Sequence, residues 1–182
     1  MLAAAGTPNL WNQFLTASVA GLVTAALYAI AASGLVVTYT TSGVFNFAHG
    51  AFGMMAAFTY WQFTEGWGLP IWLSLLLVVG VVAPVFGGIV EKGLMRGLEG
   101  TSELIKLVVT VSLLLALIGL APVIWDPTIA RSVPEFFPDS DPITIAGVGI
   151  SIHRIIIFVA AGLVAVFLRL FLYNTRTGIA MR

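Results

Sequence analysis

The polar residues most able to act on a solute lie in a short stretch rich in glycine. Asn46 and His49 stand among Gly43, Gly50 and Gly53, with long apolar runs on both sides. Polar and ionisable side chains at membrane depth mark either a solute path or a hydrogen bond to a neighbouring helix. For a lone amide and a lone imidazole, the residues themselves leave both roles open.

The glycines of this stretch favour a break in the helix. Glycine lowers helix propensity and permits positive φ. A broken backbone at membrane depth is tolerated where it is buried in protein or lines a water-filled cavity, and it exposes the partial charges of helix ends. Such a site suits a polar or zwitterionic solute. We therefore expect Gly43, Asn46, His49 and Gly50 to lie in a substrate pathway or at a helix break beside it.

A second group of charged residues is basic and has a topological meaning. Lys92, Arg96 and Lys106 lie between two long apolar runs. Short loops rich in Lys and Arg stay in the cytoplasm, so this predicted basic loop should be cytoplasmic. The end of the sequence should lie on the same side, since it carries three more arginines: Arg169, Arg176 and Arg182.

Five apolar segments must position these groups. They cover residues 14–39, 44–63, 70–90, 107–125 and 155–173. Each is close to the ~20 residues that a helix needs to cross ~30 Å of hydrocarbon. The predicted fold is therefore an all-α integral membrane protein, a single transmembrane domain over residues 1–182, with the second helix broken near its start. Pro84 lies within the third segment and should kink it.

The segment order predicts an outer loop over residues 126–153. This loop is acidic, with Asp126, Glu135, Asp139 and Asp141 against Arg131. Five crossings with this loop outside place the N-terminus outside and the C-terminal end in the cytoplasm. The five tryptophans fall at the predicted outer ends, where indole rings prefer the membrane boundary; they are Trp11, Trp61, Trp67, Trp72 and Trp125.

The outer loop should contain a small β-hairpin. Its four prolines exclude a continuous helix; they are Pro127, Pro134, Pro138 and Pro142. Residues 143–152 then alternate largely between apolar and other residues around Ala146 and Gly147. Alternation with a period of two around a short turn predicts two antiparallel strands.

Composition excludes several functions. Of 182 residues, 59% are hydrophobic and 9% are charged, which is far from a soluble domain, and the formal net charge of zero argues against nucleic acid. Cysteine is absent, so disulfides and thiolate metal sites are excluded. Neither a catalytic constellation nor a phosphate-binding glycine loop is visible, and we expect no metal site, no enzyme activity and no cofactor in this chain.

One stretch resembles a known family. The run Gly43-Val-Phe-Asn-Phe-Ala-His-Gly50 resembles the permease subunits of branched-chain amino acid ABC importers, specifically the LivH-like member of the pair. Residues 28–39 are similar to the family's approach to this motif. Residues 91–96 are similar to its basic cytoplasmic loop, and residues 174–182 to its cytoplasmic run after the fifth crossing. The resemblance covers about residues 11–182.

The resemblance implies an importer of hydrophobic amino acids in the cytoplasmic membrane. Its partners would be a second permease subunit, two cytoplasmic ATPases that hold ATP and Mg²⁺, and an extracytoplasmic solute-binding protein. The sequence departs from the family in two ways. Ala51 stands where members commonly carry an acid, and the sequence ends at Arg182, where the family continues. We therefore expect the N-terminal part of a permease.

Two other functions are compatible with these residues. Urea and short-chain amide importers use closely similar permeases, so the solute could be of that kind. A structural or regulatory membrane subunit without a pathway of its own is the other alternative.

Overall fold

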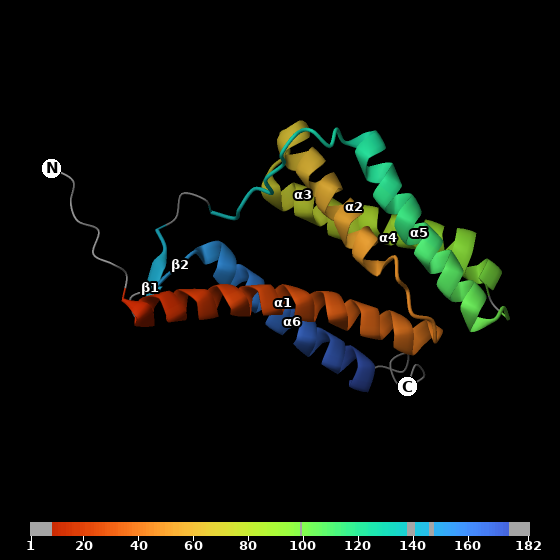
Figure 1. Cartoon of the computed structure of the whole chain (residues 1–182), viewed down its shortest axis with the longest axis horizontal. Helices are drawn as coiled ribbons and strands as arrows, with labels where there is room; N and C mark the ends of the chain where they lie inside the picture. The colour runs from red at the N-terminus through yellow and green to blue at the C-terminus, as the bar shows by residue number, and fades with distance from the viewer. Residues whose placement is uncertain (1–8, 99, 138–140, 146–147, 175–182) are drawn as a thin grey trace. The chain divides into compact units, whose positions relative to one another are not determined.

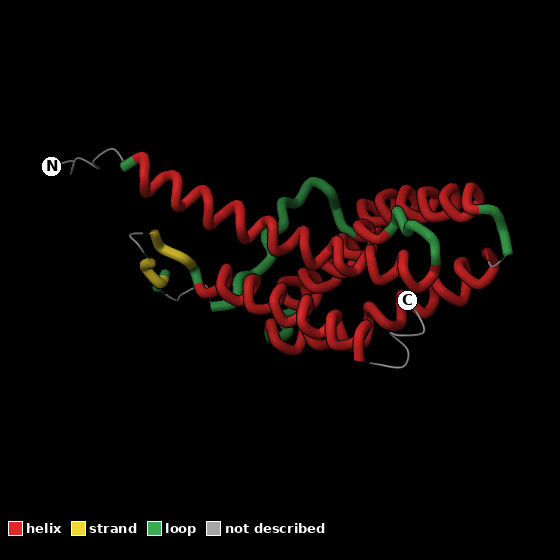
Figure 2. The backbone as a smooth tube through the Cα atoms, turned by 90° about the horizontal axis from the view of Figure 1, so that it is seen from below, coloured by secondary structure: helices red, strands yellow, loops and turns green. Residues whose placement is uncertain are grey.

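The computed structural model describes residues 9–98, 100–137, 141–145 and 148–174. Helices account for most of this backbone (Figures 1 and 2). The chain divides into two compact units, which we describe separately. One comprises residues 35–134, and the other comprises residues 1–34 and 135–182.

In the unit of residues 35–134, the regular elements among the described residues are all helices. The unit begins with the last turns of α1 (Leu10–Ser42), followed by α2 (His49–Trp61), which continues as a π-helical turn, η1 (Gln62–Gly66). A long helix follows, composed of α3 (Ile71–Leu77), η2 (Val78–Val82), α4 (Ala83–Val90), η3 (Glu91–Met95) and η4 (Arg96–Leu98). The last helix is α5 (Glu103–Ile124).

The other unit holds the first part of α1, the strands and the last helix. Strands β1 (Ile143–Ile145) and β2 (Val148–Ile150) pair antiparallel, with Ile143 opposite Ile150, and α6 (Ile152–Asn174) follows. The predicted hairpin is therefore confirmed. Its turn residues, Ala146 and Gly147, lie outside the described residues.

Four helices are long and apolar enough to cross a membrane: Leu10–Thr40, Ile71–Leu98, Glu103–Ile124 and Ile152–Phe171. The multi-pass membrane fold is thus confirmed. The second predicted crossing requires a correction, because its helix begins at His49 rather than at Val44. Its 13 α-helical and five π-helical residues span about 25 Å, slightly short of the ~30 Å of hydrocarbon.

The long helix departs from α-helical geometry where Pro84 predicts a kink. The π-helical turn η2 ends two residues before Pro84, which occupies the first turn of α4. Proline has no N–H to donate, and its ring crowds the carbonyl of Gly80 four residues earlier. A widened turn at this position relieves that crowding.

The buried core of the helical unit is small. Helix α2 packs against α5 and η2, and the rings of Phe52 and Phe86 meet edge to face with centroids 5.5 Å apart. The residues between these helices include Ala51, Val78 and Leu117, all buried. Many large apolar side chains elsewhere are exposed, as expected of helices whose outer faces contact lipid or other subunits.

Candidate functional site

The connection between α1 and α2 contains the break that the glycines predict. Helix α1 ends at Ser42, and Gly43 adopts a φ of 65°, a left-handed conformation that glycine reaches without steric cost. The carboxamide oxygen of Asn46 accepts a hydrogen bond from the Ala48 N–H at 3.0 Å. The His49 N–H donates to the Asn46 carbonyl at 3.2 Å, and α2 begins there. Asn46 therefore shapes the turn that starts α2.

The position of the break requires a correction for one glycine. Gly50 and Gly53 lie inside α2 with helical backbone, and a Cβ at either would meet open space. The helix is interrupted before His49, so Gly43 is the glycine whose conformational freedom is used. The aromatic rings of Phe45 and Phe47 pack together within the connection, with centroids 4.9 Å apart.

A cavity of about 710 Å³ opens beside this connection, and we name it the inner cavity after the orientation proposed below. Asn46 lines it from the connection before α2, and His49 lines it from the first residue of α2. Its other lining residues come from the end of α1, the connection, α2, the C-terminal half of the long helix and α5: Thr38, Val44, Phe52, Gly87, Val90, Glu91, Met95, Arg96, Leu98 and Lys106. Two groups that the sequence analysis treated separately, the pathway candidates and the basic loop, therefore meet in one cavity.

Not every predicted residue takes part in this cavity. Lys92 belongs to η3 but is not among the lining residues, and neither is Gly50. Gly43 lines a smaller neighbouring cavity of about 160 Å³, which shares Lys106 with the inner cavity.

The inner cavity combines charges of both signs with apolar walls. The Arg96 Nε lies 3.8 Å from Glu91 Oε1, in an ion pair whose two side chains are mostly exposed. Lys106 adds a second cation, while Phe52 and Val90 offer apolar surface. Such a cavity can accept the two opposite charges and the apolar body of a zwitterion. Within the part of the chain that the structure describes, no three His, Asp or Glu side chains gather as a metal site requires.

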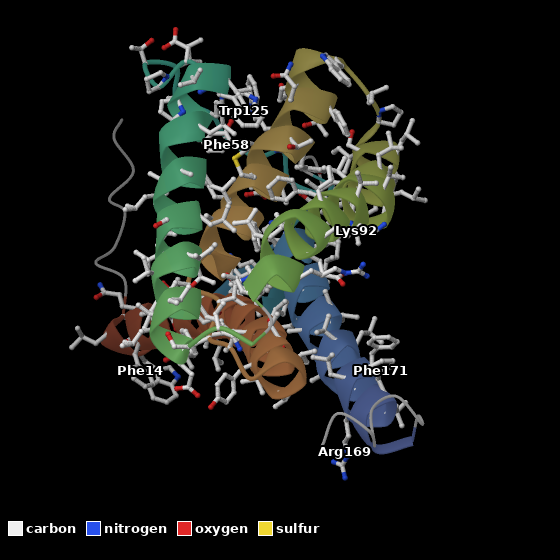
Figure 3. The ribbon with its side chains drawn as sticks, turned by 90° about the vertical axis from the view of Figure 1, so that its right-hand side faces the viewer. Phe14, Phe58, Lys92, Trp125, Arg169 and Phe171 are labelled. Carbon is white, nitrogen blue, oxygen red and sulfur yellow. The ribbon has the colours of Figure 1, made fainter. Side chains whose placement is uncertain are left out.

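The opposite end of α2 holds contacts that the sequence analysis did not anticipate. The rings of Phe58 and Trp125 stack with centroids 5.0 Å apart and lie side by side in Figure 3. The Trp125 Nε1–H donates to Gln62 Oε1 at 3.2 Å. The Arg131 guanidinium carbon lies 4.7 Å from the centre of the Trp61 ring. The sequence signal that could have indicated these contacts was the position of Trp61 and Trp125 at segment ends, which we interpreted only as a mark of the membrane boundary.

The residues after α5 form a turn around an acid. The backbone N–H and the hydroxyl of Thr128 both donate to Asp126 Oδ1, at 2.9 and 2.7 Å. These two hydrogen bonds are the main reason that the pKa of Asp126 is lower than its ordinary value, and the charge of Arg131 adds to the effect. Asp126 therefore remains ionised, and it holds the loop that carries Arg131.

Comparison with known proteins identifies the family. Residues 17–182 match the family described as "Branched-chain amino acid transport system / permease component". The chain belongs to this family. Among curated relatives of this permease chain is the high-affinity branched-chain amino acid transport system permease protein BraD of Pseudomonas aeruginosa, which is 29% identical over 185 residues. The alignment covers 96% of this chain and 60% of the relative.

The family assignment confirms the resemblance that rested on the stretch from Gly43 to Gly50. The chain spans about 60% of the length of its curated relative. No solved structure matches it. The LivH-like assignment and the roles of Asn46, His49 and the basic loop stay predictions.

Proposed function

We propose that this chain is part of the transmembrane permease subunit of an ABC importer for branched-chain amino acids. The family match over residues 17–182 and the similarity to a branched-chain amino acid permease support this function. The four long apolar helices supply the membrane-spanning scaffold. ATP hydrolysis with Mg²⁺ would belong to two separate cytoplasmic ATPases. A second permease and an extracytoplasmic binding protein would complete the importer.

The observation that carries the proposal is the composition of the inner cavity. A branched-chain amino acid has an ammonium group, a carboxylate and an apolar side chain. Glu91 can accept the ammonium group, Lys106 or Arg96 can bind the carboxylate, and Phe52 offers apolar contact. Asn46, just before α2, and His49, at its first residue, can add hydrogen bonds.

The proposed orientation places the inner cavity at the cytoplasmic end. Arg96 and Lys106 line it, and basic residues in short connections remain on the cytoplasmic side. The N-terminus and the loop of residues 126–153 would then face outward. In this orientation the inner cavity is the last site that a solute would leave on entering the cell.

Uptake by the complete transporter tests the role of the inner cavity. We expect His49→Gln and Asn46→Ala to reduce leucine uptake into proteoliposomes about tenfold, the effect of losing one or two polar contacts. Insertion into the membrane should persist. His153→Gln is the matched control, because this histidine stacks on Phe136 in the other unit and should leave uptake unchanged. Wild-type uptake by both His49→Gln and Asn46→Ala would remove these residues from the pathway.

Orientation can be tested by labelling, because this sequence contains no cysteine. We expect Lys92→Cys to react with a membrane-impermeant maleimide only after the inner face is exposed. Ser132→Cys, in the loop after α5, should react on intact cells. The opposite pattern would overturn the proposed orientation.

A further inference from the structure

A second cavity, of about 380 Å³, lies between the C-terminal ends of α2 and α5, and we name it the outer cavity. Met54 and Phe58 line it from α2, and Ala121 and Pro122 line it from α5. The end of α5 and the loop after it add Trp125, Pro127, Ile129 and Arg131 to the lining. Its lining is apolar apart from Arg131. A volume of this size is typical of small-molecule sites, which range over about 300–1,000 Å³.

The loop after α5 holds Arg131 in place at this cavity. The Arg131 Nη1 donates to the carbonyl oxygens of Asp126 and Ile129, at 2.6 and 3.2 Å. The guanidinium also lies over the Trp61 ring. These contacts come from one loop and one helix, so the orientation of the cation is set before any ligand arrives.

Within the described residues, Arg131 interacts with the acid Asp126 only weakly, as the smallest contribution to the lowered pKa of that carboxyl group. It forms no ion pair there, because the carboxylate of Asp126 accepts instead from Thr128. Its Nε is buried without a hydrogen-bond partner in the same residues. Carbonyl oxygens and a ring face stabilise a guanidinium but carry no negative charge, so the positive charge beside this apolar cavity is only weakly compensated. A bound anion would compensate this charge.

We propose that the outer cavity binds a small carboxylate with an apolar tail. Resting on the function proposed above, this ligand is the branched-chain amino acid as it arrives at the outer face. Arg131 binds its carboxylate, because a guanidinium pairs with that group through two parallel hydrogen bonds. Met54 and Phe58 contact its side chain. A lipid phosphate shares the anionic chemistry, and the experiment separates the two sources.

Photo-crosslinking of the complete transporter tests this site. The transporter, in phosphatidylcholine nanodiscs with its binding protein and without nucleotide, is exposed to photo-leucine, a diazirine analogue of leucine. Labelled peptides are mapped by mass spectrometry. We expect label within residues 54–62 or 121–131, competed by leucine but not by leucinamide, whose amide replaces the carboxylate. Arg131→Gln should reduce this label about tenfold.

Two further variants guard against misfolding. Met54→Trp fills the cavity without touching the contacts of Arg131, and it should also remove the label. Arg169→Gln, which changes an exposed arginine near the end of α6, is the matched control, and its labelling should equal that of wild type. Equal labelling of wild type, Arg131→Gln and Met54→Trp would overturn the proposal.

The remaining measurements distinguish a lipid ligand from an amino acid ligand. They also distinguish failure of the outer-cavity proposal from failure of the proposed transport function. If added phosphatidylglycerol displaces the label from wild type, the site is a lipid site and the proposal fails. Leucine uptake is measured on the same samples. Normal uptake with unchanged labelling of Arg131→Gln would refute the outer site alone, whereas a wild-type transporter that fails to move leucine would refute the proposed function and this assignment together.

Discussion

The two ends of α2 are built in different ways. In the orientation that we propose, the C-terminal end of α2 is the outer end. There, Phe58, Trp61 and Gln62 contact Trp125 and Arg131, through a ring stack, a cation–π contact and a hydrogen bond. At the inner end, the hydrogen bonds of Asn46 and His49 stay within the connection that precedes the helix. The outer end is therefore tied to distant residues by side chains. The inner end is shaped mainly by local backbone conformation, and its ring contact with a distant residue is that of Phe52 with Phe86.

This difference predicts which end opens more readily. Local opening costs least where few buried contacts join one element to another. The inner cavity is also the larger, at about 710 Å³ against about 380 Å³ for the outer cavity. A transporter must rearrange at the site where it releases solute. The residues that we propose for the pathway lie at the less constrained end.

The largest expected effect comes from removing the central residue of the outer end. Trp125 is buried, stacks on Phe58 and bonds to Gln62. We expect Trp125→Ala to lower the free energy of unfolding by about 3 kcal/mol, as truncation of a large buried aromatic does. Denaturation of the purified permease in SDS measures this. Trp67→Ala, at a residue that is 64% exposed, should cost less than about 1 kcal/mol. Equal losses would show that the contacts of Trp125 do not stabilise the outer end more than an exposed tryptophan does.

The next prediction tests whether the backbone conformation of Gly43 stabilises the inner end. Gly43 has positive φ, and a Cβ at this position would meet open space, so Gly43→Val should cost about 1–2 kcal/mol through conformation alone. Gly50→Ala is the matched control. It also meets open space but lies in regular helix, where alanine is favoured by up to about 1 kcal/mol. The two variants should therefore shift stability in opposite directions. A loss from both would indicate that Gly50 has a packing role.

The features predicted correctly from the sequence are those set by local physics. The period of two around residues 143–152 gave the hairpin, because alternation determines which side chains share a face of a strand. The glycine-rich stretch gave the break before α2, since Gly43 can adopt positive φ. The start of α2 was placed too early, because Val44, Phe45 and Phe47 continue the apolar pattern through a connection that is not helical.

The features that the sequence did not reveal depend on distant contacts. Trp125 and Gln62 are separated by 63 residues, and no local pattern pairs them. Likewise, Asn46 and Arg96 line one cavity only because the long helix returns toward the start of α2. Candidate residues were predictable from their types, whereas their assembly into sites was not.

A smaller effect isolates the hydrogen bond at the outer end. Gln62→Met preserves length and removes the acceptor for Trp125, so we expect a loss of about 0.6–1.7 kcal/mol, the range for side-chain hydrogen bonds within membranes. Trp125→Phe removes the donor. In a double-mutant cycle the two changes should couple by a similar amount, since each abolishes the same bond. Strictly additive losses of stability would show that this hydrogen bond does not stabilise the packing of α2 against α5.

The smallest expected effect on stability concerns the ion pair at the inner end. Glu91 and Arg96 are 64% and 63% exposed, and exposed ion pairs contribute about 0–1 kcal/mol. Glu91→Gln should therefore leave SDS denaturation almost unchanged while leucine uptake falls, because the variant loses the proposed acceptor for the ammonium group. Glu65→Gln, an exposed acid near the opposite end of α2, should alter neither quantity. If Glu91→Gln destabilised the protein as strongly as Trp125→Ala, the ion pair would be a structural tie, and the inner end would be as constrained as the outer.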